Sequence, residues 1–399
     1  MRVSGRKSLL LRAVLGLILI ISLIVGAGFL GYKRYLAPEH PTPTQWSLEG
    51  DVSEALQRNL EADLEANPTR NSSSLHVIAP QLGLDAGFVA GLADPKRGEA
   101  MRVDHSLRIA SVTKSYVAAT AFALQERGVL SLQDTVRERV SPEYIDMLIA
   151  DGFDVDAITL FHLVSHRSGI ADYASHLFYQ AQILSYDVFG RGPKWTVESQ
   201  LAFAMKHEDP LFAPGLQASY SDTGYILLGD AIERATGMSL AQAVRETLDF
   251  DALGLKNTWW EVFETPTGPD DRVHQYVGGF DATEVDASID LFGGGGLVAT
   301  QRDLAHGMRA IVNGEMFADP QTIELMRTAT EPHFGAGLYR MNFNVGLCFG
   351  HGGYWGLLVV HCPDDDLTVA LTYTQANANG QGRNINEILK GLVARQDAQ

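Results

Sequence analysis

The stretch IASVTKSYVAAT, residues 109–120, places a serine and a lysine three residues apart where an extended pattern gives way to a helical one. From Ser111 onward, Tyr116 and small residues after it can share one face of a helix that Gly128 would end. Residues three apart on a helix lie on the same face, so the Ser111 hydroxyl and the Lys114 amine are expected to point to one place. A serine becomes a nucleophile when a neighbouring group takes its proton, and a lysine can do so once it is neutral.

Length, composition and charge limit what the rest of the chain can be. With 399 residues, 46% of them apolar, the chain can bury a large core in one large domain or two. Its net charge of -17 leaves no basic face for phosphates, which argues against nucleic acid as a partner. Internal repeats are not apparent.

The N-terminus has the pattern of a membrane segment. Basic residues precede an apolar run at residues 13–30, and about 20 such residues cross a bilayer. Positive charge is heavier before the run than after it, which favours a cytoplasmic N-terminus. We therefore predict a transmembrane signal anchor at residues 1–32, in the plasma or inner membrane, with the rest of the protein outside the cytoplasm, in the periplasm. A cleaved signal peptide is the alternative, since residues 26–28 are small.

The chain after this segment divides into a linker and one domain. Residues 33–50 contain three prolines and are predicted to be a linker. In the domain at 51–399, strand patterns occur at 75–94 and again near the C-terminus, whereas about 111–290 is mostly helical. These patterns predict an α/β fold in which one antiparallel sheet, built from both chain ends, is flanked by helices and carries a large helical insertion.

The two cysteines, Cys348 and Cys362, lie at equal distances from Trp355 in FGHGGYWG. If this stretch is a tight hairpin, they face each other across two strands, and a disulfide is permitted outside the cytoplasm. The alternative is a pair of buried free thiols, since many cross-strand pairs lack the required Cα separation.

Two further stretches carry chemistry. Tyr220 and Asp222 lie in ASYSDTG, a loop before a predicted helix, where the tyrosine could share a proton with the serine and lysine described above. His351 and Gly353 lie in HGG on an apolar strand, where glycines let a ligand approach the backbone.

In order and spacing these three stretches resemble the motifs of the serine β-lactamase and penicillin-binding-protein superfamily, S-x-x-K, Y-S-x and H-x-G. The similarity is greatest to the class C-like branch, which also holds DD-peptidases, D-aminopeptidases and esterases. ITLFHLVSHRSGI at 158–170 and GGGGLVATQRDLA at 293–305 also resemble segments of this family. The resemblance extends from about residue 51 to the C-terminus and implies no metal or organic cofactor.

The resemblance also implies a role for each matching residue. Ser111 would be the nucleophile that becomes acylated, and Lys114 and Tyr220 would exchange its proton as the general base. His351 would line the substrate pocket. The backbone N–H groups of Ser111 and Tyr354 would form the oxyanion hole.

Two residues depart from the pattern of true β-lactamases. Asp222 stands where lactamases of this branch carry an asparagine, and a carboxylate accepts but does not donate hydrogen bonds. His351 replaces the lysine that meets the β-lactam carboxylate, and a histidine is often neutral at pH 7. Both changes favour an esterase or D-peptidase over a β-lactamase.

We therefore predict a membrane-anchored serine hydrolase that acts through an acyl-enzyme on Ser111, on an ester or a D-amino-acid peptide or amide. The alternatives are a β-lactamase, or a penicillin-binding receptor or cell-wall binding protein with little turnover. The partners implied are a small-molecule or peptide substrate and the membrane; the pattern leaves the oligomeric state open.

Other motif interpretations are weaker. His162 and His166 have the spacing of metal ligands on a helix, but no third ligand motif follows, so we expect structural roles. Residues 293–296 are glycines without the G-K-[ST] ending of a phosphate loop. No G-x-S-x-G is present, which disfavours an α/β-hydrolase elbow.

Overall fold

The computed structural model describes residues 39–267, 271–328, 334–376 and 378–398. The predicted anchor at 1–32 therefore lies outside the described residues. Within the described part of the chain, no helix combines the length and apolar character that a membrane crossing requires.

A seven-stranded antiparallel sheet forms the centre of the fold, in the order β3-β2-β1-β12-β11-β10-β9. Its strands are β1 Ser72–Ala79, β2 Leu84–Asp94, β3 Glu99–Ala100, β9 Tyr339–Phe343, β10 Gly346–Gly353, β11 Leu357–Cys362 and β12 Leu367–Thr372. The first and last parts of the chain meet where β1 pairs with β12, with Leu75 opposite Leu371. Both strands are buried along their whole length. The predicted sheet from both chain ends is confirmed.

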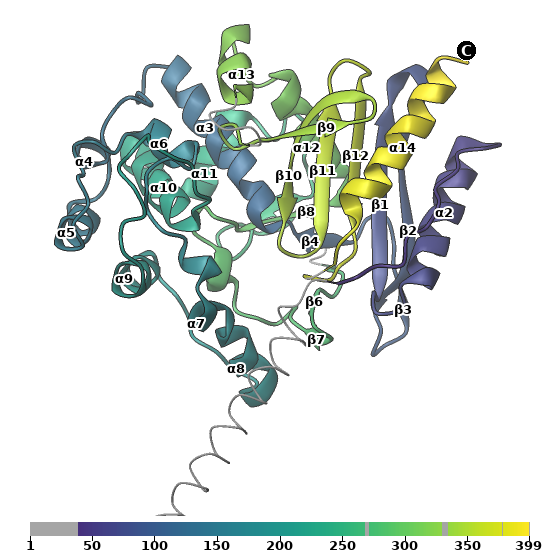
Figure 1. Ribbon diagram of the computed structural model, residues 1–399, viewed down its shortest axis with the longest axis horizontal. Coiled ribbons are helices and arrows are strands. Elements are labelled where there is room, and N and C mark those ends of the chain that lie inside the picture. Colours follow the sequence, from purple (N-terminus) through teal and green to yellow (C-terminus); the bar gives the residue numbers. More distant parts are fainter. Residues whose placement is uncertain (1–38, 268–270, 329–333, 377, 399) are drawn as a thin grey trace, which may run out of the picture.

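Helices cover both faces of this sheet (Figure 1). On one face lie α2 (Val52–Ala66) and α14 (Gln381–Gln396), whose apolar residues share a core with β1, β11 and β12. The other face packs against α12 (Gln301–Asn313) and α3 (Thr113–Glu126) in a second, larger core. Amphipathic spacing explains the positions of α2, α12 and α14, since each buries its apolar stripe on the sheet, whereas α3 is buried along nearly its whole length.

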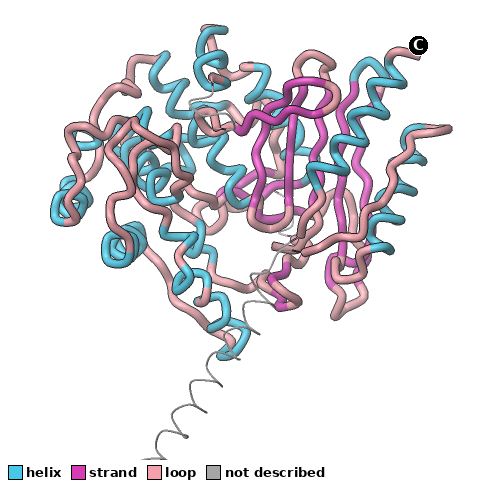
Figure 2. Tube along the Cα trace, in the orientation of Figure 1, coloured by secondary structure: helices cyan, strands magenta, loops and turns pink. Residues whose placement is uncertain are grey.

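The long middle part of the chain forms a mostly helical lobe beside the sheet, which Figure 2 shows in cyan. Its helices are α4 Val136–Arg139, α5 Pro142–Ala150, α6 Leu160–Val164, α7 Leu177–Gln180, α8 Gln182–Phe189, α9 Val197–His207, α10 Asp222–Thr236 and α11 Leu240–Leu248. Short strands that the sequence pattern did not predict lie at its border, namely β4 Ser106–Arg108, β5 Thr258–Trp260, β6 Tyr276–Val277, β7 Phe280–Asp281 and β8 Leu297–Thr300. Helix α13 (Pro320–Arg327) leads back to the sheet.

The helix after the predicted nucleophile begins later than the sequence pattern indicates. The helix expected from Ser111 begins at Thr113, because a 3-10 turn at Ala110–Val112 precedes it. Helix α6 begins at Leu160, where the side chain of Thr159 caps it by accepting from the His162 N–H.

The described part of the predicted linker is attached to the domain. Trp46 and Leu48 are buried in the core beside α2 and α14. Glu39 forms an ion pair of 2.8 Å with Arg70. The sequence of this part predicts a linker, because a stretch with prolines and few apolar residues has no periodicity that would reveal such packing.

The two cysteines form a disulfide. Cys348 on β10 and Cys362 on β11 face each other with their Cα atoms 4.2 Å apart. Of the two alternatives that the sequence left open, the cross-strand bridge is therefore the one in the structure. It joins the strand that carries His351 to its neighbour in the sheet.

Candidate active site

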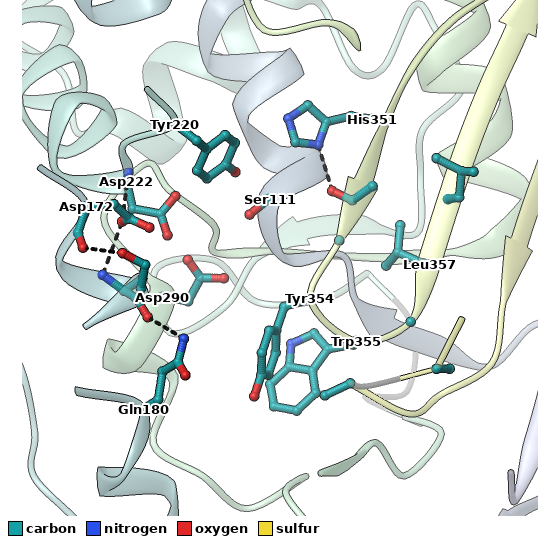
Figure 3. A pocket seen from close by; sticks show the side chains of 18 of the residues that line it. Ser111, Asp172, Gln180, Tyr220, Asp222, Asp290, His351, Tyr354, Trp355 and Leu357 are labelled. Carbon is teal, nitrogen blue, oxygen red and sulfur yellow. Dashed lines mark hydrogen bonds between the residues drawn. The ribbon is translucent and has the colours of Figure 1, made fainter. Parts of the chain in front are cut away.

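Ser111 lies at the base of a cavity of about 570 Å³ between the sheet and the helical lobe. It is the middle residue of the 3-10 turn that leads into α3, and Ala110 before it has a left-handed φ of 45°. A positive φ is uncommon for a residue other than glycine and tends to occur at functional sites. This turn directs the Ser111 hydroxyl into the cavity (Figure 3).

Lys114 lies one helical turn further along, and its side chain is fully buried. Its ammonium group donates to the Ser111 hydroxyl at 3.0 Å and to the Gly294 carbonyl, and it forms an ion pair with Asp222. The predicted meeting of the serine and the lysine is thus present. The glycine-rich stretch at 293–296 thus contacts Lys114 through a backbone carbonyl group.

Carboxylates, not positive charges, surround this lysine. Burial by itself would lower the pKa of Lys114, but the carboxylates of Asp222, Asp290 and Asp172 together raise it above its ordinary value. The amine is therefore protonated in the resting site. A neutral lysine, which a general base requires, must arise by moving its proton to a neighbouring group.

Asp172 and Asp290 were not predicted from the sequence. Both line the cavity, and burial followed by the nearby Asp222 carboxylate raises the pKa of Asp172 to about 7 and that of Asp290 to about 8. Neither belongs to a catalytic motif. Asp172 lies just after the family-like stretch at 158–170, and Asp290 lies just before the one at 293–305. Their wide separation in sequence hides the fact that they share one charge cluster.

Tyr220 reaches the site from the loop before α10. Its hydroxyl points toward Ser111 (Figure 3), and its ring centroid lies 4.9 Å from the Lys114 ammonium. Burial, followed by the Asp222 carboxylate, raises the pKa of Tyr220 well above its usual value, so the resting residue is a neutral phenol. The loop is held by His166, whose Nδ1 accepts from the Ser221 N–H at 3.2 Å and whose ring stacks on that of Tyr220 at 4.5 Å.

The two histidines considered as metal ligands thus have other partners. His166 supports the Tyr220 loop, and the Nδ1 atom of His162 accepts from the Thr159 N–H at 3.2 Å at the start of α6. Both have the structural role expected of them.

The third motif forms the opposite wall of the cavity. His351 is buried on β10, and its Nδ1 donates to the Gly352 carbonyl at 2.6 Å. Burial, followed by the charge of Lys114, lowers the pKa of His351 to about 3, so the ring is neutral. A Cβ atom at Gly353 would lie 2.5 Å from the Ile109 carbonyl oxygen, which shows how closely β10 packs against the turn of the serine.

Tyr354, predicted to contribute a backbone N–H to the oxyanion hole, follows Gly353 at the turn from β10 to β11. It lines the cavity, where its ring contacts that of Trp355 at 5.0 Å. Of the seven predicted site residues, six line the cavity, and the seventh, Lys114, touches it through Ser111. Their catalytic roles remain predictions.

The charge of the cavity wall is one-sided. Asp172, Asp222 and Asp290 line it together with Tyr179 and Trp355, and none of the described lining residues is a lysine or an arginine (Figure 3). The cavity therefore combines an apolar, aromatic part with a group of carboxylates.

The sequence model of the family described as Beta-lactamase matches residues 79–392 of this chain. The chain belongs to the Beta-lactamase family. This family assignment confirms the resemblance inferred from the three motifs, and the matched region contains every predicted site residue.

Two relatives are similar in sequence to part of this chain. Penicillin-binding protein 4* of Bacillus subtilis is 28% identical over 192 residues, which are 48% of this chain and 38% of that protein. Esterase EstB of Burkholderia gladioli is 32% identical over 224 residues, which are 54% of this chain and 53% of that protein. The matched part of the chain thus spans about half or less of the length of these relatives.

Among solved structures, the D-amino acid amidase from Ochrobactrum anthropi SV3 complexed with D-phenylalanine has a similar fold, with a TM-score of 0.73 and 22% identity. The likeness covers 87% of this chain and 100% of the other. It confirms the predicted α/β fold. Together, the family model and the relatives place the chain among proteins of the β-lactamase and penicillin-binding-protein type.

Proposed function

We propose that this protein forms an acyl-enzyme on Ser111 and hydrolyses esters or amides of D-amino acids or D-peptides. The observation that carries the proposal is the hydroxyl of Ser111 in the cavity, where it accepts a hydrogen bond from Lys114 and faces the hydroxyl of Tyr220 (Figure 3). A serine so placed has two partners that can move its proton, which is the arrangement that nucleophilic catalysis needs.

The proton path follows from the resting charges. If the Lys114 proton moves to Asp222, the neutral amine can take the Ser111 proton as the hydroxyl attacks the acyl carbon. Tyr220, a phenol at rest, then gives its proton to the departing alcohol or amine and regains one from Lys114. The Ser111 proton thus ends on the leaving group, and Asp222 still holds the proton that the lysine gave up.

Developing negative charge on the acyl oxygen needs donors at the same place. The backbone N–H groups of Ser111 and Tyr354 are the proposed pair, since Gly353 brings β10 into contact with the turn that carries the serine. For deacylation, we propose that Tyr220 and Lys114 activate a water molecule by the reverse transfer.

The charge of the cavity favours acyl donors that are neutral or carry an amine. A substrate carboxylate, as in a β-lactam, would lie beside Asp172, Asp222 and Asp290 and would find no free cation among the described lining residues, because Lys114 already pairs with Asp222 and His351 is neutral. Burying a negative charge without a partner is costly, and the raised pKa values of Asp172 and Asp290 reflect the same cost at this site. The names of the relatives, an esterase and a D-amino acid amidase, agree with this preference.

We further propose that the enzyme is anchored in the membrane by residues 1–32 and acts outside the cytoplasm. The support is the apolar run at 13–30 with its basic flank. A cross-strand disulfide agrees with an oxidising compartment. Labelling an engineered surface cysteine in intact cells with a membrane-impermeant reagent tests the location; protection from the reagent would contradict it.

The first test of the acyl-enzyme is intact-mass spectrometry of the full chain exposed separately to a p-nitrophenyl ester, a D-alanyl peptide and a penicillin. A transient adduct with the ester or the peptide that is absent from Ser111→Ala is the expected result. The variant should unfold at nearly the same temperature as the wild type, since it removes one hydroxyl. Hydrolysis retained by Ser111→Ala would overturn the mechanism.

The charge preference needs a separate, matched pair of substrates. The N-(4-aminobutanoyl) and N-succinyl forms of one D-amino-acid p-nitroanilide are similar in size and differ chiefly in the sign of the charge at the end of the acyl group. We expect kcat/KM to be at least about tenfold higher for the free amine, which corresponds to ~1.4 kcal/mol. Equal values, or faster turnover of the succinyl form, would contradict the preference. A penicillin adduct that never clears would favour the receptor alternative.

A further inference from the structure

Three side chains with metal-binding atoms meet outside the active-site cavity, on the sheet face that α12 covers. They are His76 on β1, Asp85 on β2 and His306 on α12. Their ligand atoms all lie within 4.8 Å of one another. Because the three come from separate elements, only the packing of α12 against the β1–β2 hairpin brings them together.

Both imidazoles direct their Nε2 atoms toward the carboxylate of Asp85. The Nε2 atom of His76 is 2.8 Å from Asp85, and the Nε2 atom of His306 is 3.1 Å and 3.2 Å from its two oxygens. Two donors bound to one tetrahedral zinc ion lie roughly 3.3 Å apart, given metal–ligand distances of about 2.0–2.2 Å. The nitrogen–oxygen separations of 2.8 Å, 3.1 Å and 3.2 Å are close to this value, and the ligand nitrogens of the two histidines lie within 4.8 Å of each other. Small side-chain rotations therefore suffice to admit an ion.

The surroundings fit a site with an open position. The His76 side chain is 6% exposed, whereas His306 is 24% and Asp85 47% exposed, so one ligand is anchored and the others face solvent. Opposite His76 in the β1–β2 register stands Gly87, at which a Cβ atom would lie 3.3 Å from the His76 Nδ1 atom. The glycine thereby leaves room for the ring.

We propose that His76, Asp85 and His306 bind one zinc ion, with a water molecule completing the coordination. Two imidazole nitrogens and one carboxylate oxygen are a donor set that Zn²⁺ accepts readily. None of the three residues lines the cavity of Ser111. The ion would therefore be separate from the chemistry at Ser111, and it would fasten α12 to the β1–β2 hairpin. This proposal is independent of the proposed hydrolase activity.

A second cluster in the described part of the chain offers a contrast. Glu99, His105 and Asp271 also have ligand atoms within 4.8 Å. There, however, the Arg102 guanidinium forms ion pairs with both Glu99 and Asp271. A fixed cation is thus already paired with both carboxylates. At Asp85 the partners are two imidazoles, which an ion can join.

Zinc chloride titrated into the full chain by calorimetry, after removal of metals with a chelator and in detergent, tests the proposal. We expect one ion per chain for the wild type, and binding weakened at least ~10-fold in His306→Ala and in Asp85→Asn. His207→Ala is the matched control, because His207 lies beside His176 and Glu208 in another imidazole-rich part of the surface.

Cobalt supplies an independent readout in the same preparations. Co²⁺ at a site with two nitrogens and one carboxylate gives visible absorption bands, which should appear with the wild type and His207→Ala and be lost with the other two variants. Both test substitutions are at partly exposed positions, and circular dichroism checks that the variants are folded. Absence of saturable binding by the wild type would overturn the proposal. So would equal binding by the wild type and both test variants.

Discussion

Replacement of Asp290 by asparagine tests the charge cluster around the nucleophile. Asp290 ends the 3-10 turn at Ala287–Asp290 and packs so closely on the Gly-rich stretch that a Cβ atom at Gly295 would lie 2.1 Å from its carboxylate. Asn has nearly the same shape and no charge. The substitution therefore removes the ionisation of this side chain while leaving its packing largely in place.

The sign of the effect follows from the raised pKa. The carboxyl group ionises near 3.8 in the unfolded chain but at about 8 in the folded protein, because of burial and then the Asp222 carboxylate. Between these values the folded state holds a proton that the unfolded state lacks. Its contribution to stability is therefore fully present below pH 3.8 and is lost as the pH rises toward 8.

The magnitude follows from the width of this window. Each pH unit corresponds to ~1.4 kcal/mol, so a lone carboxyl with this pKa change would account for on the order of 5 kcal/mol. Asp172, with its pKa raised to about 7, shares the same cluster, and removing the Asp290 carboxylate eases its ionisation, which reduces the loss further. Between pH 5 and pH 9 the Asp290 shift covers about 3 pH units, so we expect Asp290→Asn to remove ~4 kcal/mol of the pH-dependent loss.

Urea unfolding followed by circular dichroism at pH 5, 7 and 9 measures this difference. The wild type should lose stability from pH 5 to pH 9, and the loss should be smaller in Asp290→Asn. Asp146→Asn is the matched control, since Asp146 is an exposed carboxylate on α5, and its curve should run parallel to that of the wild type. Parallel curves for all three proteins would refute the reasoning, because Asp290 would then titrate as a solvated group.

Three further predictions concern the neighbouring elements. Lys114→Ala should slow acylation by about 10²–10⁴-fold in burst kinetics, since it removes the proposed proton acceptor; a burst at the wild-type rate would contradict its role. Replacing both Cys348 and Cys362 by alanine should lower the free energy of unfolding by about 3 kcal/mol in urea titrations, because the bridge spans a sequence separation of 14; an unchanged midpoint would contradict this. Gly353→Ala should reduce kcat/KM, because its Cβ atom would lie 2.5 Å from a backbone oxygen, whereas Gly352→Ala meets nothing nearer than 3.5 Å and should be milder. Equal effects of the two glycine substitutions would show that this close contact does not matter.

Much of the fold could be predicted because it is encoded locally. Asp51 caps α2 by accepting from the Glu54 N–H, and Gly237 and Gly314 end α10 and α12 in left-handed conformations. Such signals depend on residues within a few positions of one another, so the sequence displays them directly. The same holds for the S-x-x-K pair, since one helical turn brings Ser111 and Lys114 together wherever the helix lies.

Other features depend on contacts between distant parts of the chain. The sequence did not reveal that residues 39–50 pack on the domain, and it left open whether the two cysteines form a disulfide. Both features depend on the distance between segments that are separate in the sequence.

The sequence alone determined the family and the meeting of Ser111 with Lys114, because both are written in short, ordered motifs. Only the tertiary structure decided the electrostatic state of the site. Asp172 and Asp290 are more than a hundred residues apart, and folding places both near Lys114. Coulomb energies depend on distance and burial in three dimensions. The protonated lysine and the acidic wall of the cavity therefore follow from packing.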